Sequence, residues 1–307
     1  MTEEHGTGPH ADPRAVLERP APPPDVLLRY GTDPEQVADL RMPDRPADAT
    51  EPAEPADTTD PIGTAETTGT AGTARPLVVV VHGGFWRVEY DRRHTGPLAA
   101  DLAGRGYPVV QLEYRRTGQP GGGWPGTLDD VAAGLDALPG LVDEVIPAGR
   151  MAPGPPILLG HSAGGHLALW AARRAPDRVR GVLALAPVLD LAEAYRLDLD
   201  GGAVAALLGG GPEEFPDRYA AADPTRSAPP PVRTSIVHGA LDRQVPVAAS
   251  RRYAAGAPGA ALRFVELPEC EHFGVIDPLS RAWPAVLAEL HWLAGRSGGI
   301  DAASRSR

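Results

Sequence analysis

From residue 75 onward, short continuous apolar runs alternate with longer segments in which apolar residues recur at helical spacing. The apolar runs predict strands at 76–81, 108–114, 156–160, 179–187, 234–239 and 262–267. The segments between them predict helices at 91–105, 127–145, 164–175, 247–256 and 280–294. Strands that are apolar throughout are buried on both faces, and their alternation with helices is typical of a parallel sheet. The pattern predicts an α/β fold with a mostly parallel central sheet and helices on both faces.

The first 74 residues lack this alternation. Residues 1–24 are polar and rich in proline, and we expect a disordered tail there. Residues 25–43 carry apolar runs on both sides of a turn signal and predict a hairpin. Residues 47–74 contain one large aliphatic side chain, Ile62, so they cannot bury enough surface to offset the entropy of ordering. We expect a disordered insert there.

Composition is consistent with one folded domain over residues 25–297, followed by a flexible tail at 298–307. The chain has 307 residues, of which 42% are hydrophobic, and this is enough for a sizeable core. Its net charge of −11 comes almost entirely from residues 1–74, which hold 15 acidic and 5 basic side chains. Nothing in this distribution would attract nucleic acid or an anionic membrane.

The chain shows no sign of a leader peptide or of a membrane span. Its first residues are acidic and polar, and the longest apolar runs are far too short to cross a bilayer. The single cysteine, Cys270, excludes a disulfide within the chain. We therefore expect a cytoplasmic protein whose partner is a small molecule.

The segment "GHSAGG" at 160–165 carries the strongest chemical signal. Gly160-x-Ser162-x-Gly164 matches the nucleophile-elbow pattern, and it lies between a predicted strand and a predicted helix. Glycines two residues before and after the serine allow a turn so sharp that side chains would collide there. A glycine-rich turn without chemistry is the alternative, but the strand–helix context favours Ser162 as a nucleophile.

A serine nucleophile needs a base, and the base needs a carboxylate that orients it. Asp242 follows the predicted strand at 234–239, and His272 follows the next strand. This gives the order Ser162, Asp242, His272 at the carboxyl ends of strands, the edge of an open α/β sheet where ligands bind. Asp190, which follows an earlier strand, remains an alternative acid.

Other titratable residues have simpler predicted roles. Asp277 is expected to cap or support the loop after His272. His161 precedes Asp242 and so breaks the expected order, and we expect it to be a packed or hydrogen-bonded neighbour. No pair of histidines has the spacing of metal ligands, and we expect neither a metal nor a cofactor.

The segment "HGGFW" at 82–86 follows an apolar strand upstream of the serine, and it predicts an oxyanion hole. The expected donors are the backbone N–H of Ala163 and that of Gly84 or Phe85. We expect Trp86 and Trp124 to contact substrate.

Two further features, a glycine-rich segment and the single cysteine, have simple structural interpretations. Trp124 lies in "GGGWPG" (121–126), whose glycine spacing matches the G-x-G-x-x-G motif of dinucleotide-binding sites. The structural context does not match, because the segment does not directly follow a strand and contains Pro125. We expect a loop near the mouth of the site instead. Cys270 lies two residues before His272 and is expected to be a small packing residue, although modification of an exposed thiol there would block the site.

Residues 190–230 form a long connection with one predicted helix at 202–208, and they predict a short cap. Such a cap would offer an apolar lining of Leu191, Tyr195, Leu207, Leu208, Phe215 and Tyr219. The alternative is that these side chains pack on the sheet. Because the segment is too short for a large lid, we expect small or medium substrates.

Four segments together resemble the α/β-hydrolase superfamily, in the esterase/lipase branch that includes kynurenine formamidases (arylformamidases). They are "HGGFW", "GHSAGGHLALW", "HGALDRQVPVAAS" and "EHFGVIDP". Hormone-sensitive-lipase-type esterases usually carry HGGG and GDSAG, whereas this chain has Phe85 and His161 at the differing positions. The resemblance therefore points away from that branch.

The residues and the resemblance together predict a serine hydrolase that cleaves small to medium carboxylic esters or aryl formamides. His272 would take the proton of Ser162, Asp242 would hold the imidazole, and water would hydrolyse the acyl-enzyme. One alternative is a serine peptidase of the prolyl-oligopeptidase-like type. Another is a non-catalytic binding protein on a hydrolase scaffold, although all three triad positions are filled here.

Overall fold

The computed structural model describes residues 12–43, 74–257 and 261–295. The expectations for residues 1–11, for the tail at 298–307 and for nearly all of the 47–74 insert lie outside these ranges. No helix within them is long and apolar enough to span a bilayer.

A single eight-stranded sheet runs through the molecule in the order β1-β2-β4-β3-β5-β6-β7-β8. The strands β3 to β8 pair in parallel, whereas β1 and β2 form an antiparallel hairpin that joins the sheet through β4. Their bounds are β1 Val26–Arg29, β2 Val37–Arg41, β3 Val78–Val81, β4 Val109–Leu112, β5 Ile157–His161, β6 Gly181–Leu185, β7 Arg233–Gly239 and β8 Leu262–Leu267. Each strand predicted from the apolar runs is confirmed, and so is the hairpin at 25–43.

Helices cover both faces of this sheet, and the alternation of side chains along a strand explains why. In β3, Val79 and Val81 pack into one buried cluster, and Val78 and Val80 pack into the other. The first cluster is covered by α3 (Gly126–Asp143), α4 (Ala163–Arg174) and α8 (Ala248–Ala255). The second is covered by α2 (Gly96–Gly104) and α9 (Trp283–Ala294). The predicted α/β architecture is confirmed.

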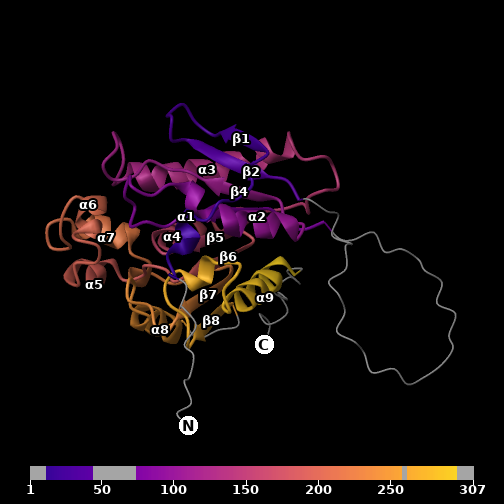
Figure 1. Cartoon of the computed structure of the whole chain (residues 1–307). Coiled ribbons are helices and arrows are strands. Elements are labelled where there is room, and N and C mark those ends of the chain that lie inside the picture. Colours follow the sequence, from indigo (N-terminus) through magenta and orange to yellow (C-terminus); the bar gives the residue numbers. More distant parts are fainter. Residues whose placement is uncertain (1–11, 44–73, 258–260, 296–307) are drawn as a thin grey trace, which may run out of the picture.

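The connection at 190–230 holds three short helices, which Figure 1 shows gathered on one side of the molecule. They are α5 (Leu191–Arg196), α6 (Ala203–Leu208) and α7 (Pro216–Ala222), followed by the 3-10 helix η3 (Pro224–Arg226). Only the helix at 202–208 was predicted. Most of the expected apolar lining packs into the core instead, because Leu191, Leu207, Leu208 and Tyr219 are fully buried. The alternative, that these side chains pack, therefore holds for these four, whereas Tyr195 is exposed.

Residues 12–24, which we expected to be disordered, are ordered in the structure. They form the short helix α1 (Ala15–Glu18) and an extended proline segment, and we call residues 12–24 the strap. Figure 1 shows α1, in indigo, beside the yellow C-terminal part of the chain. The prediction for this stretch is wrong because it counted local composition and missed contacts with distant parts of the chain.

Three kinds of contact hold the strap. Val16 is buried in the core beside α2 and α9. The Arg19 guanidinium makes a two-point ion pair with the carboxylate of Asp277. The buried Arg41 side chain donates to the carbonyl oxygens of Pro22 and Pro23. A polar, proline-rich segment is ordered here by side chains that belong to other elements.

Candidate active site

Ser162 occupies a strained turn between β5 and α4. Its backbone has φ 55° and ψ −118°, a conformation that a non-glycine residue adopts only when its surroundings enforce it. A side chain at Gly160 would collide with the carbonyl oxygen of Gly164, and one at Gly164 would collide with that of Val81. The requirement for glycine at both positions, predicted from the motif, is thus a steric fact of this fold.

The structure brings Asp242 and His272 together beside that turn. Asp242 lies in the loop after β7, and His272 lies in the loop after β8. The His272 Nδ1 atom is 2.6 Å from the Oδ2 atom of Asp242. His272 and Ser162 both line a cavity of about 70 Å³, which we call the catalytic cavity. All three residues are nearly inaccessible to solvent.

The Asp242 carboxylate accepts four hydrogen bonds. Its Oδ1 accepts from the backbone N–H groups of Gln244 and Val245, each at 2.8 Å. Its Oδ2 accepts from His272 and from His238 Nε2, the latter at 3.1 Å. Burial alone would raise the pKa of this carboxyl, but the hydrogen bonds from His238 and His272 outweigh it and hold the pKa well below its usual range. Asp242 is therefore a carboxylate that orients the His272 ring.

His238 is a supporting residue that the sequence reasoning did not single out. It is fully buried, and its Nδ1 atom is 2.8 Å from the hydroxyl of Ser250 on α8. With this contact fixed, Nε2 is left to donate to Asp242 and to the carbonyl of Val245. The only signal in the sequence was its position in "HGALD", at the end of a strand and four residues before Asp242.

The loop after β3 turns its backbone toward the same cavity. Gly84, Phe85 and Trp86 all have positive φ values, of 102°, 49° and 58°. Gly84 and Phe85 line the catalytic cavity. Ala163 is the first residue of α4, where the N–H groups have no acceptor inside the helix and the helix dipole favours negative charge. The expected oxyanion donors therefore lie on the two segments that flank Ser162.

A buried network holds this loop in place. His82 Nε2 is 2.8 Å from Glu113 Oε1, and the Tyr114 hydroxyl donates to the carbonyl of His82 at 2.8 Å. The rings of His82 and Tyr114 also stack at 4.3 Å. Burial opposes ionisation of Glu113, but the neighbouring His82 and Arg116 outweigh it and lower the pKa to about 2. Sequence reasoning missed Glu113, which looked like an ordinary strand-end residue.

The two tryptophans expected at the substrate lie elsewhere, which corrects that prediction. Trp86 is fully buried in the core, with its ring 5.3 Å from that of His166. Trp86 does not line the catalytic cavity, whereas its neighbour Phe85, which also has a positive φ, does. Trp124 is half-buried against the same core, and its backbone N–H donates to the carbonyl of Leu207 in α6. The loop at 121–126 therefore packs on the cap.

The alternative acid, Asp190, is occupied elsewhere. It caps α5 by accepting from the backbone N–H of Glu193 at 2.8 Å, and it also pairs with Arg252. Asp277 accepts from the backbone N–H of Leu279 and pairs with Arg19, which agrees with the supporting role expected of it. Asp242 is thus the carboxylate that the fold places at His272.

His161 lines the catalytic cavity and Cys270 adjoins it, and neither is expected to react. His161 Nε2 is 3.1 Å from the carbonyl oxygen of His272, and the two rings lie 4.6 Å apart. Burial, with His272 beside it, holds the pKa of His161 well below its usual range, so this ring is neutral. Cys270 is also buried, and burial raises its pKa to about 12, so its thiol is protonated at ordinary pH.

The rim of the catalytic cavity contains residues from distant segments. Two come from the strap, Arg14 and Leu17, and the cap contributes Asp200, which pairs with Arg87 at 2.6 Å. The cavity is also lined by Tyr90, His94, His161, Gln244 and Phe273. In the parts of the chain described by the structure, no group of three or more His, Cys, Asp or Glu side chains could hold a metal ion.

A fully buried histidine on α4 connects the nucleophile turn to the cap. The His166 backbone N–H donates to the carbonyl of Ser162, and His166 Nε2 lies 2.9 Å from the carbonyl oxygen of Ala222 at the end of α7. Burial lowers the pKa of His166 to about 4, so the ring is neutral and donates through Nε2. One side chain thus fixes the cap relative to the helix that carries the site.

Comparison with solved structures establishes the fold as that of the α/β-hydrolases. Esterase B from Lactobacillus rhamnosis (HN001) superposes with a TM-score of 0.66 at 17% identity, over 92% of this chain and 89% of that one. A bifunctional GH43-CE protein of Bacteroides eggerthii also gives a TM-score of 0.66, at 18% identity. It covers 88% of this chain, but the chain spans only 38% of that larger protein.

Sequence comparison gives the family. A curated relative, "Putative esterase NocK" of Nocardia uniformis subsp. tsuyamanensis, is 36% identical over 114 residues. This match covers 36% of the chain and 33% of the relative, so it spans about a third of each. The family model BD-FAE matches residues 67–255, which is more than half of the chain and includes Ser162 and Asp242. The chain belongs to the BD-FAE family.

Proposed function

We propose that the protein is a serine hydrolase that cleaves small to medium carboxylic esters or aryl formamides. The observation that carries this proposal is the meeting of three groups at one small cavity: the strained Ser162, the His272 ring on the Asp242 carboxylate, and the backbone turn at Gly84 and Phe85. Acyl transfer requires these groups: a nucleophile, an oriented base and donors for an oxyanion. Membership of the BD-FAE family and the esterase names of its relatives support the same reaction class.

In the proposed reaction, His272 takes the proton of Ser162 through Nε2 as the hydroxyl oxygen attacks the substrate carbonyl carbon. Asp242 accepts from Nδ1 and stabilises the imidazolium that forms. The negative oxygen of the tetrahedral intermediate accepts from the backbone N–H of Ala163 and from that of Gly84 or Phe85. His272 then protonates the leaving alcohol or amine, and water repeats the sequence on the acyl-enzyme. Loss of one oxyanion donor lowers the rate by about 10²–10³.

The size of the catalytic cavity supports short acyl groups. A volume of about 70 Å³ leaves room for a formyl or acetyl group next to Ser162 but not for a long alkyl chain. Both proposed substrate classes, aryl formamides and small esters, meet this limit. A panel of p-nitrophenyl esters assayed beside N-formylkynurenine tests the two. A preference for the formyl amide favours the formamidase assignment, and indifference to it leaves a carboxylesterase.

Ser162→Ala provides the decisive test of the reaction class. We expect kcat to fall by about 10⁴-fold or more, since the nucleophile is lost. A fluorophosphonate probe should label the wild-type protein at Ser162 and leave the variant unlabelled. A wild-type protein that the probe does not label would favour the non-catalytic alternative. Near-normal hydrolysis by Ser162→Ala would refute the proposed function.

A further inference from the structure

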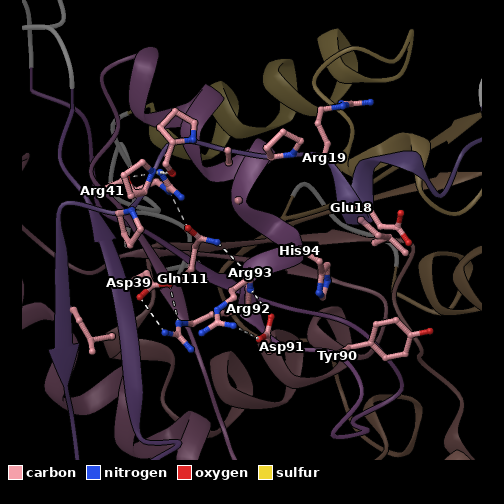
Figure 2. Close-up of a pocket in the computed structure, with 18 of the residues that line it drawn as sticks. Glu18, Arg19, Asp39, Arg41, Tyr90, Asp91, Arg92, Arg93, His94 and Gln111 are labelled. Atoms are coloured by element: carbon pink, nitrogen blue, oxygen red, sulfur yellow. Dashed lines mark hydrogen bonds and ion pairs between the residues drawn. The ribbon is translucent and has the colours of Figure 1, made fainter.

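A second, larger hollow lies between the strap and the body of the molecule, and Figure 2 shows the residues around it. Its volume is about 900 Å³, and we call it the strap groove. The prolines of the strap form one wall, and the opposite wall includes Arg41, Arg92 and Gln111. Arg41 Nε donates to Gln111 Oε1 at 2.9 Å, so side chains within this wall hydrogen-bond to one another.

The strap groove and the catalytic cavity share one partition. Four residues line both hollows: Arg14, Leu17, Tyr90 and His94. Two of these, Arg14 and Leu17, belong to the strap, so part of the wall next to Ser162 comes from a segment more than 140 residues away along the chain. Of the four, only Leu17 is aliphatic, and it packs against the buried cluster that contains Val16.

Residues on both sides of this partition make contacts with other parts of the molecule. On the strap side, the Arg14 guanidinium lies over the Phe273 ring, 5.5 Å from its centroid, and Arg19 is paired with Asp277. On the body side, the His94 ring makes edge contacts with His82 and Tyr90, at 5.7 and 6.3 Å between centroids. The Leu17 side chain therefore stands between two walls whose residues make contacts that do not involve Leu17.

We propose that Leu17 is a specificity-determining residue: its side chain separates the catalytic cavity from the strap groove and so limits the size of the substrate group that lies next to Ser162. This inference rests on the proposed hydrolase function. Leu17 takes no part in the chemistry, and its effect is on which substrates fit. Truncation to alanine would join the cavity of about 70 Å³ to the groove of about 900 Å³. A chain too long for the first could then extend into the second.

The test compares Leu17→Ala with two matched variants. Leu279→Ala removes the same atoms from a side chain that is 78% exposed on the loop after Asp277. Leu17→Met keeps the volume and changes only the shape. Each protein is assayed with p-nitrophenyl esters from acetate to octanoate, which vary the acyl group. Each is also assayed with ethyl and hexyl acetates, which vary the alcohol.

In one of the two series, Leu17→Ala should raise kcat/KM for the long substrate relative to the short one by about tenfold or more. Leu279→Ala and Leu17→Met should keep the wild-type ratio within about twofold. Unchanged ratios in both series for Leu17→Ala, with acetate hydrolysis intact, would overturn the inference and leave the proposed function standing. A wild-type protein that hydrolyses no ester or formamide would overturn both.

Discussion

The catalytic cavity has two walls of different construction. Ser162, Asp242 and His272 lie on a wall built from strand ends, where all three residues are buried and the Asp242 carboxylate accepts four hydrogen bonds. The strap forms the other wall, with an exposed Arg14 and a partly exposed ion pair between Arg19 and Asp277. In the proposed reaction the chemistry thus depends on buried groups, whereas the proposed limit on substrate size depends on a segment outside the sheet.

Energetics explain the contrast. Removing one partner from a buried hydrogen-bonded charge leaves the other unsatisfied, which costs several kcal/mol, whereas an exposed ion pair contributes about 0–1 kcal/mol. Substitutions should therefore have large effects on activity at the strand ends and small effects on stability at the strap.

Asp242→Asn should have the largest effect. An amide in place of the carboxylate offers His272 a less favourable partner, and we expect kcat/KM for a p-nitrophenyl ester to fall by about 10³–10⁴-fold. The matched control is Asp190→Asn, which alters a carboxylate that follows the preceding strand and caps α5. Steady-state kinetics should show near-normal activity for the control. Equal losses of kcat/KM in both variants would mean that Asp242 affects activity only through the stability of the fold.

Glu113→Gln should affect stability in a pH-dependent way. Because the pKa of Glu113 is lowered to about 2 from a usual value near 4.5, its ionised form stabilises the folded state at pH values above about 5. That contribution is lost as the pH falls toward 2. At pH 7 the variant should be less stable by about 1–3 kcal/mol, since His82 loses a charged partner. Thermal unfolding between pH 3 and pH 7 should show a shallower pH dependence in the variant.

Glu269→Gln is the matched control for that experiment, because Glu269 is exposed on the loop before Cys270. Its unfolding curves should follow those of the wild type at every pH. A Glu113→Gln protein with the same pH dependence as the wild type would contradict the role assigned to the buried carboxylate.

Arg19→Met should have the smallest effect on stability, about 1 kcal/mol or less, because both partners of the ion pair are partly exposed, at 27% and 18%. The control is Arg178→Met, which breaks the exposed pair with Asp136 elsewhere on the surface. Both variants should melt close to the wild type. Only Arg19→Met should increase the relative hydrolysis of long substrates, since only it loosens the strap. If Arg19→Met lowered the free energy of unfolding by more than about 3 kcal/mol, the strap would be as sensitive to substitution as the wall that holds Ser162.

The sequence predicted the wall that holds Ser162, Asp242 and His272 because its constraints are local. The glycines around Ser162 and the strand ends before Asp242 and His272 can each be recognised from a few neighbouring letters. The order of the strands in the sheet then brings the three residues together. This explains why the sheet, the flanking helices and the positions of these residues could be predicted without a structure.

The strap and the supporting network could not be predicted in this way, because their constraints come from distant residues. Val16 is buried by side chains of α2 and α9, and Arg19 pairs with a carboxylate 258 positions further along the chain. Trp86 was expected at the substrate, but it is fully buried, and its ring contacts that of His166 on α4. The sequence around Trp86 does not show this contact with a distant segment.

The contact between His166 and the Ala222 carbonyl has a consequence for protein engineering. Loops and caps of related enzymes are often exchanged as modules, and a replacement cap is usually judged by whether it fits the opening of the site. Here a replacement would also have to present a backbone acceptor to an imidazole buried one turn below the nucleophile. A donor cap without that acceptor would leave a buried N–H unsatisfied at the base of α4. Grafts should therefore end before Ala222 or reproduce the end of α7.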